Sequence, residues 1–239
     1  MWSGPRNLST AMMYSFGNRS DCSVWDEPFY AAYLAKTGLD HPMLAEILAA
    51  GEHDDKLVAN RCIGDIPEGK QVFYQKHMAH HMLPGFDREW MRDVVNVFLI
   101  RDPAKVIASY HAKRENPTLD DIGFRQQAEI FKQVVEKNGT IPAVIDCGDI
   151  LANPEQTLRI LCDFIDLDFQ QNMLQWPKGR HQDDGAWADH WYKSVWESSG
   201  FSIAPDMSKP DLPTSGEVVL KEAYPYYEMM LKYQIAAAT

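Results

Sequence analysis

A short run near the N-terminus combines a tight turn, a cation and two hydroxyl side chains. Residues 4–10 read GPRNLST and lead into a series of good helix formers. Backbone N–H groups at a helix N-terminus have no intrahelical partners, and the helix dipole there favours negative charge. Arg6 adds a fixed cation, and Ser9 and Thr10 add hydroxyl donors. The run therefore predicts a pocket for a phosphate or a sulfate.

This run is not a Walker A motif, which requires G-x-x-x-x-G-K-[ST]. Counting from Gly4, Ser9 stands in place of the second glycine and Thr10 in place of the lysine. An ordinary helix N-terminus capped by serine or threonine explains the same residues, so other features of the chain must decide between the two interpretations.

A second charged turn follows an apolar run in the middle of the chain. Residues 94–100 (VVNVFLI) are nearly all apolar, which is typical of a strand buried on both faces. Arg101 follows directly, and ligands of open α/β sheets bind beyond the carboxyl ends of the strands. Asp102 and Pro103 suit a helix start, and Ser109 lies about two turns into that helix. Alternatively, Arg101 pairs with a carboxylate and Ser109 is a neutral helical residue.

Strands and helices that alternate along the chain must position these residues. Periodicity predicts strands at 24–25, 71–75, 94–100 and 142–146, and helices at 11–16, 28–36, 42–48, 103–113, 122–137, 154–165 and 216–233. This alternation favours an α/β fold with a mostly parallel central sheet and helices on both faces. Residues 170–213 are rich in tryptophan and predict an irregular C-terminal lobe or lid. Only Met1 to Ser3 precede the first turn, so the first strand is either very short or truncated.

Composition narrows the class of protein further. The 239 residues, 45% hydrophobic and 24% charged, fit a single domain spanning 1–239. A net charge of −11 argues against a duplex nucleic-acid partner. The four cysteines show no CxxC spacing, which favours reduced thiols. Because no apolar stretch is long enough to span a membrane and no leader is visible, we expect a cytoplasmic protein without a membrane partner.

The order of these motifs resembles the sulfotransferases that use 3′-phosphoadenosine 5′-phosphosulfate (PAPS), in a bacterial-type member. In that family a P-R-S-G-T-T-like loop binds the 5′-phosphosulfate, and a later strand ending in R-(D/N)-P, followed by V-x-S, binds the 3′-phosphate. Residues 146–165 and the tryptophan-rich residues 176–201 extend the resemblance. It implies a P-loop-like nucleotide-binding fold, PAPS as co-substrate and no required metal. The donor-binding residues that it implies are Arg6, Asn7, Leu8, Ser9, Thr10, Arg101 and Ser109.

Leu8 is the main departure from that pattern, because it occupies the glycine position of the family loop. If the position requires a positive φ, leucine is strained there. Arg6 stands where cytosolic members have lysine. Its planar, permanently charged guanidinium suits the catalytic role of neutralising the leaving phosphate.

Two candidates for the catalytic base remain open. Glu27 follows the extended run at 24–25, and burial among neighbouring aromatic residues would raise its pKa toward that of a useful base; alternatively it is a carboxylate at a helix start. His77 lies in the run KHMAHH (76–81), where cytosolic members carry K-T-H in a register that differs by one, and His80 is an alternative to it. His77 and His81 would share one face of a helix, but the glutamate of H-E-x-x-H is absent, so no metal site is predicted.

The resulting functional hypothesis is transfer of a sulfuryl group from PAPS to the hydroxyl or amine of a small-molecule acceptor. Two other functions remain open. One is a P-loop kinase-like phosphotransferase, which usually needs the lysine that is missing here. The other is a non-catalytic nucleotide- or anion-binding module that forms part of a larger fused enzyme. Neither the acceptor nor the oligomeric state follows from the sequence.

Overall fold

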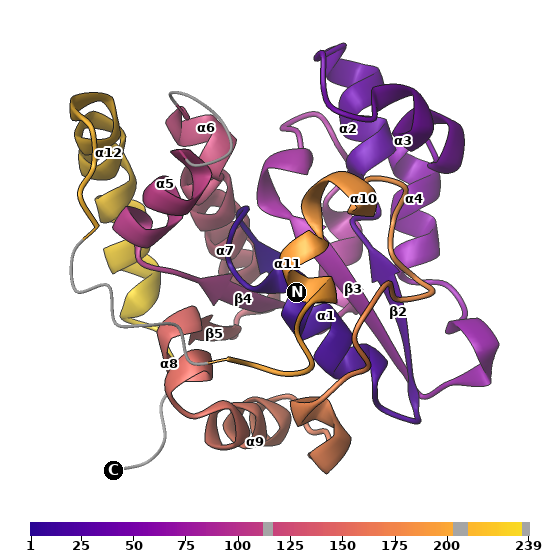
Figure 1. The fold of residues 1–239 in the computed structure, drawn as a ribbon. Coiled ribbons are helices and arrows are strands. Elements are labelled where there is room, and N and C mark those ends of the chain that lie inside the picture. Colours follow the sequence, from indigo (N-terminus) through magenta and orange to yellow (C-terminus); the bar gives the residue numbers. More distant parts are fainter. Residues whose placement is uncertain (112–116, 203–209, 236–239) are drawn as a thin grey trace.

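Five short strands form one sheet at the centre of the computed structural model, which describes residues 1–111, 117–202 and 210–235 (Figure 1). The strands are β1 (Trp2–Ser3), β2 (Cys22–Asp26), β3 (Val72–Met78), β4 (Val97–Ile100) and β5 (Ala143–Asp146). Every pair is parallel, and the order is β2-β3-β1-β4-β5. The predicted α/β fold with a parallel sheet is confirmed.

The shortest strand, β1, occupies the centre of the sheet. Trp2 pairs with His77 of β3 on one side and with Phe98 of β4 on the other. Because all strands run in the same direction, the turns that follow β1, β3 and β4 meet at one edge of the sheet. Ligands of open α/β sheets bind beyond the carboxyl ends of the strands, at the point where the strand order reverses.

Helices cover both faces of the sheet. They are α1 (Ser9–Gly17), α2 (Tyr30–Thr37), α3 (Leu44–Ala50), α4 (Asp55–Cys62), α5 (Pro103–His111), α6 (Leu119–Ile122), α7 (Phe124–Asn138), α8 (Cys147–Ala152), α9 (Pro154–Phe164), α10 (Ala188–Trp191), α11 (Lys193–Trp196) and α12 (Thr214–Leu231), with single 3-10 turns η1 (Pro67–Gly69), η2 (Ala79–His81), η3 (Glu89–Asp93) and η4 (Gln171–Leu174). Helices α1 and α9 pack on one face, whereas α4, α7 and α12 pack on the other. The last residues of the helix predicted at 103–113 lie outside the described residues.

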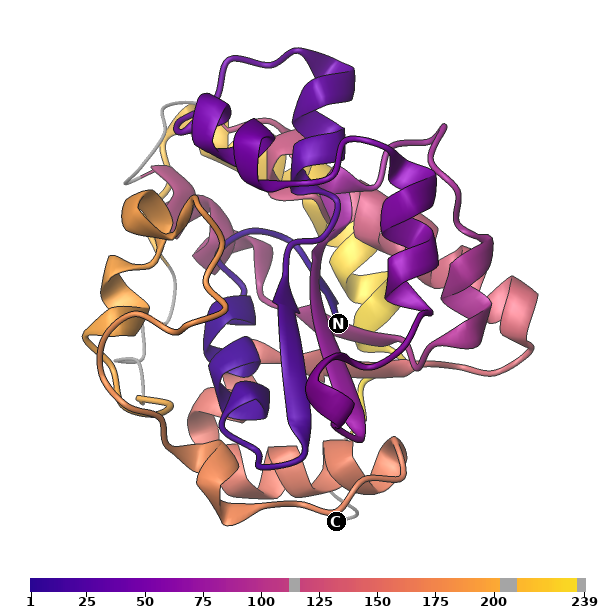
Figure 2. The same cartoon turned by 90° about the vertical axis from the view of Figure 1, so that its right-hand side faces the viewer.

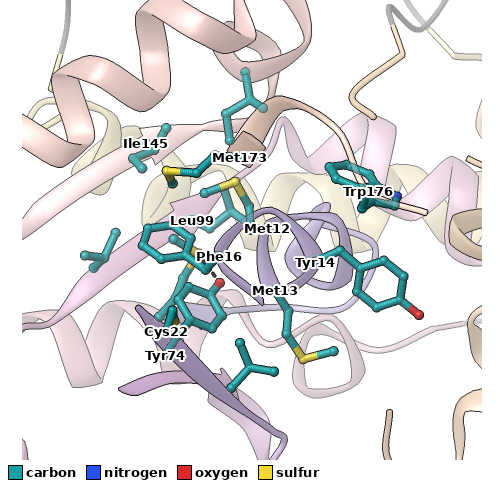
Figure 3. Packing of buried hydrophobic residues seen from close by; sticks show 14 of the residues in the cluster. Met12, Met13, Tyr14, Phe16, Cys22, Tyr74, Leu99, Ile145, Met173 and Trp176 are labelled. Carbon is teal, nitrogen blue, oxygen red and sulfur yellow. Dashed lines mark hydrogen bonds between the residues drawn. The ribbon is translucent and has the colours of Figure 1, made fainter. Parts of the chain in front are cut away.

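The central strands bury side chains on both faces, as the apolar run predicted. In β4, Val97 and Leu99 belong to one hydrophobic cluster, whereas Phe98 and Ile100 belong to the other. This alternation follows from the two-residue period of a strand. Figure 3 shows the first cluster, in which Met12 of α1 lies near Leu99. The helix that follows the first turn is thereby packed against the sheet.

Strand β4 begins three residues later than predicted because of Asn96. Its side-chain amide donates to the carbonyl oxygens of Met91 at 2.7 Å and Val94 at 3.1 Å, which closes a turn before the strand. Its side-chain oxygen accepts the indole N–H of Trp2 at 2.8 Å. Asn96 therefore starts β4 and connects it to the central strand.

The C-terminal lobe is the described part of residues 170–213, and it lies beside α1 in both views, drawn in orange (Figures 1 and 2). It contains η4, α10 and α11, and Gln175 forms an isolated bridge with Gly200. Within the described part of the chain, no helix has both the length and the apolar character needed to cross a membrane.

Gln127 of α7 provides a test of how the central strands are held. Its buried amide donates to the carbonyl oxygens of Trp2 at 3.1 Å and Leu99 at 2.9 Å. Replacing it with leucine removes one donor from each carbonyl group, so Gln127→Leu is expected to lower the free energy of unfolding by about 1–3 kcal/mol in urea titrations. Glu136→Leu, at an exposed position of the same helix, is the control. Equal stability of the two variants would contradict this account.

Candidate active site

A cavity of about 350 Å³ opens at the carboxyl ends of the central strands. Its lining comes from residues 5–11 after β1, from Glu27 after β2, from the end of β3 and from Arg101 after β4. The C-terminal lobe supplies Trp191 and Tyr192 on the opposite side. A concave site with a few convergent charged groups is the usual form of a ligand or active site.

The turn after β1 leads into α1 through two residues with positive φ angles. Arg6 has a φ of 65° and Leu8 a φ of 58°, so both lie in the left-handed region. Leu8 is the N-cap of α1 and makes no side-chain hydrogen bond to the helix, which begins at Ser9. Leucine in this conformation is strained by about 1–2 kcal/mol. The first N–H groups of α1 therefore lack a side-chain cap, and neither serine nor threonine fills that position.

The turn is held against the fold by close backbone contacts. Gly4 must be glycine, because a Cβ there would lie 2.5 Å from the carbonyl oxygen of Ile122 in α6. The side-chain amide of Asn7 donates to the carbonyl oxygen of Leu99 at 3.3 Å, and the backbone carbonyl oxygen of Asn7 accepts from the Cys147 thiol at 3.0 Å. Asn7 thus fixes the turn to β4 and α8, although it also lines the cavity.

Three residues from the two predicted halves of the pocket meet beside this turn. The Nε of Arg6 donates to the Ser109 hydroxyl of α5 at 2.9 Å, and Arg101 Nη1 donates to the Arg6 carbonyl oxygen at 2.6 Å. Burial, together with the nearby Arg101 charge, lowers the pKa of Arg6. Among the described residues, no carboxylate forms an ion pair with either arginine. Two adjacent cations without a carboxylate partner favour an anionic ligand.

A buried ionic cluster contributes Glu27, Lys76 and Tyr192 to the cavity lining. The Lys76 ammonium donates to Asp26 at 2.9 Å, to Glu27 at 2.6 Å and to the Tyr192 hydroxyl at 2.5 Å. The Tyr192 hydroxyl in turn lies 2.8 Å from Asp26 Oδ2. Burial alone would lower the pKa of Lys76, but the two carboxylates hold it above its ordinary value. The ammonium therefore stays charged and keeps both carboxylates in place.

Glu27 is the carboxylate of this cluster that lines the cavity. It has a φ of 41°, and its backbone N–H donates to the Lys76 carbonyl oxygen at 2.9 Å, which continues the β2–β3 pairing. Burial raises the pKa of the Glu27 carboxyl, while Lys76 acts in the opposite direction. A carboxylate with a raised pKa is suited to accept a proton near neutral pH.

The histidines do not lie as the sequence predicted. Strand β3 extends through Met78, so side chains alternate across the sheet and His77 shares no helix face with His81. His77 stacks on Trp2 at 4.5 Å, and the cavity lining does not include it. His80 and His81 do line the cavity. His77 is therefore not placed to act as a base, because the strand alternation points it to the other face from Lys76.

The C-terminal lobe docks on the core through two carboxylates. Tyr14 of α1 donates its hydroxyl to Asp184 at 2.8 Å, and the same hydroxyl oxygen accepts the Trp196 indole N–H at 3.1 Å. Asp26 of β2 accepts the Gly185 backbone N–H at 3.1 Å. These contacts hold the lobe over the cavity. Within the described ranges, no group of three or more His, Cys, Asp or Glu side chains is arranged to hold a metal ion.

Sequence reasoning missed Asp26 and Tyr192 as parts of the site. Asp26 gave a signal, since two adjacent carboxylates at a strand end imply that at least one is buried with a cation. Tyr192 gave none, because it lies 165 residues from Glu27 and reaches the cluster only when the lobe folds back. His81 was noticed only within its run of histidines.

The ionic cluster predicts a large effect of removing its cation. Lys76→Met leaves two buried carboxylates without their cation and is expected to lower the free energy of unfolding by about 3–5 kcal/mol at neutral pH. The loss should shrink in acid, because protonated carboxyl groups need no cation. Lys70→Met, which removes a single exposed hydrogen bond to Ser20, is the control in the same denaturant titrations. A loss no larger than that of the control would contradict the ionic account.

The chain is similar to two curated proteins over most of its length. Two curated proteins of Arabidopsis thaliana, "Branched-chain-amino-acid aminotransferase-like protein 1" and "protein 2", are 38% and 36% identical to the chain over 230 residues. These matches cover 96% of the chain, which spans only about 40% of the length of each relative.

Solved structures share the fold. The "Sulfotransferase Domain from the Synechococcus PCC 7002 Olefin Synthase" superposes with a TM-score of 0.61 at 15% identity, covering 98% of this chain and 94% of that one. The "Sulfotransferase Domain from the Curacin Biosynthetic Pathway" gives 0.55 at 14% identity, covering 98% and 97%. A family model described as "Sulfotransferase domain" matches residues 1–234. The chain therefore belongs to the sulfotransferase domain family.

Proposed function

We propose that this chain transfers a sulfuryl group from PAPS to a hydroxyl or amine of a small acceptor. The observation that carries the proposal is that Arg6 and Arg101 line the same cavity as Glu27, while Ser109, outside that lining, accepts a hydrogen bond from Arg6. The family, which covers nearly the whole chain, supports a transferase of this kind. We also propose that residues 1–239 act as one unit, with the described part of residues 170–213 as an irregular lobe or lid, and that the chain is a bacterial-type family member.

The residues present fit an anionic nucleotide donor. The uncapped N-terminus of α1 with Ser9 and Thr10 suits the phosphosulfate, and Arg101 with Ser109 suits the 3′-phosphate. The donor supplies an activated sulfuryl group. In the proposed step Glu27 takes the acceptor proton while the acceptor atom bonds to sulfur and the bond from sulfur to the phosphate oxygen breaks. Arg6 neutralises the negative charge that the phosphate gains with that electron pair.

A binding module within a longer protein is the second candidate function. Two observations favour it: the strained Leu8 in the anion-binding turn, and the roughly 40% of each curated relative that this chain spans. In that case the cavity would bind the nucleotide, but acceptor sulfation would not be detected.

Binding of adenosine 3′,5′-bisphosphate tests the donor site. We expect wild type to bind this nucleotide in calorimetry and Arg101→Ala to weaken binding by roughly 10- to 100-fold, because one charge-assisted hydrogen bond is lost. Adenosine 5′-monophosphate, which has no 3′-phosphate, should bind wild type and variant equally. Arg125→Ala, which removes an exposed cation of α7, is the control. Absence of binding to wild type, or unchanged binding to Arg101→Ala, would refute the donor site.

The role of Glu27 is tested by kinetics. Glu27→Gln keeps the size of the side chain but cannot take a proton, so sulfuryl transfer to the best wild-type acceptor should fall about 10²–10⁴-fold. Nucleotide affinity should stay unchanged. Since the base must be ionised and its pKa is raised, wild-type kcat should fall on acidification at a pH above the ordinary glutamate range of about 4.3. A pH-independent kcat in wild type, or full activity in the variant, would exclude Glu27 as the base.

A further inference from the structure

One oxygen of the Glu27 carboxylate is held by its neighbours and the other is not. Oε1 accepts from Lys76 Nζ at 2.6 Å and lies 3.3 Å from the Tyr192 hydroxyl. Oε2 lies 3.8 Å from Nδ1 of His81. Glu27 and His81 both line the cavity. The ionic cluster therefore leaves Oε2 as the oxygen that can receive a ligand.

The facing atom of His81 also lacks a partner. His81 is buried, with 3% of its surface exposed, and its Nδ1 makes no hydrogen bond. A separation of 3.8 Å is too long for a direct hydrogen bond between Oε2 and Nδ1, whereas a third polar atom about 2.8 Å from each would bond to both. A buried polar group without a partner is unfavourable, so the unpartnered Nδ1 favours a polar ligand atom.

The orientation and protonation of the His81 ring are defined by its surroundings. The ring stacks on Tyr30 at 4.2 Å and on Tyr33 at 4.9 Å, which fixes its plane. Burial, followed by the nearby charges of His80 and other groups, lowers the pKa of His81 well below its usual range. The ring is therefore neutral and carries one N–H. The Glu27 carboxylate beside Nδ1 favours the tautomer with the proton on that nitrogen.

We propose that the acceptor atom is a hydroxyl oxygen seated between Glu27 Oε2 and His81 Nδ1, and that His81 thereby selects alcohols and phenols over amines. This inference rests on the proposed function and narrows its substrate class. A hydroxyl group donates its proton to Glu27, accepts the His81 N–H with one lone pair and keeps a second lone pair for sulfur. A neutral amine has one lone pair, which the same N–H would occupy.

The chemical step balances with these groups alone. The hydroxyl oxygen forms a bond to sulfur, and its proton passes to Glu27 Oε2. The bond from sulfur to the phosphate oxygen breaks, and its electron pair leaves with adenosine 3′,5′-bisphosphate. His81 neither gains nor loses a proton; it positions the acceptor oxygen.

Aromatic side chains in the cavity lining favour an aromatic acceptor as the probe compound. The Tyr30 hydroxyl lies 2.9 Å from His41 Nδ1, and His41 packs against Trp191 of the lobe with ring centroids 6.0 Å apart. All three side chains line the cavity. Flat aromatic ligands pack well against such rings, so a phenol is the simplest hydroxyl compound to test.

The experiment compares 4-ethylphenol with 4-ethylaniline, which differ only in the accepting group. Sulfuryl transfer from saturating PAPS is measured for both compounds, and the ratio of the two kcat/KM values is the readout. Because the compounds differ in intrinsic reactivity, the change of this ratio on mutation is diagnostic. His81→Phe keeps the stacked ring and removes the N–H, so the phenol-to-aniline ratio should fall about 5- to 10-fold. His81→Asn, whose amide can place a donor near the Nδ1 position, should recover part of the ratio.

His77→Phe is the matched control, because this histidine is buried on the other face of β3 and lies outside the cavity lining. It should leave the ratio unchanged. No turnover of either probe, or an unchanged ratio in His81→Phe, would overturn the inference. If adenosine 3′,5′-bisphosphate still binds in those cases, the proposed donor site survives. If the nucleotide does not bind wild type, the proposed function fails and the inference fails with it.

Discussion

The buried ammonium of Lys76 is the interaction on which the arrangement of the site depends. A lone buried charge is strongly unfavourable, so this ammonium and the carboxylates of Asp26 and Glu27 can leave water only together. The three residues come from β2, β3 and the turn after β2, and the Tyr192 hydroxyl joins them from the C-terminal lobe. One ionic contact thus positions two strands and the lobe, and it leaves a single Glu27 oxygen facing the cavity.

The opposite half of the cavity depends on backbone geometry rather than on ion pairs. The two-residue strand β1 lies between β3 and β4, so the turn after it emerges beside Arg101 at the end of β4. There Arg101 donates a hydrogen bond to the carbonyl oxygen of Arg6, and the Arg6 side chain donates one to Ser109. The cavity is consequently polarised, with two cations beside the helix N-terminus and a carboxylate at the other wall. Such an arrangement separates an anionic donor from the group that accepts a proton.

Much of the fold was predictable from local patterns. The apolar run at 94–100 and the alternation of strands and helices follow from burial on both faces of a parallel sheet, and the structure has that sheet. Boundaries were less predictable, because Asn96 closes a turn inside the apolar run. The run at 76–81 was misinterpreted as helical, since β3 continues to Met78. Pairing with β1 and β2 decides that extension, and pairing between distant strands leaves no local pattern.

The sequence by itself indicated the parallel α/β architecture and the tight turn before the first helix, because turn chemistry and strand periodicity are local properties. The link between that turn, Arg101 and Ser109 came from the resemblance to the family and not from a local pattern. Only the tertiary structure decided which side chains face the cavity. In the folded chain His77 stacks on Trp2 and lies outside the cavity lining. Tyr192 contacts Glu27 although more than 160 residues separate them in the sequence, and His81 lies beside the second Glu27 carboxylate oxygen. Those outcomes depend on how the lobe packs and on which face of a strand is buried. Both follow from the free energy of the whole fold rather than from any short segment.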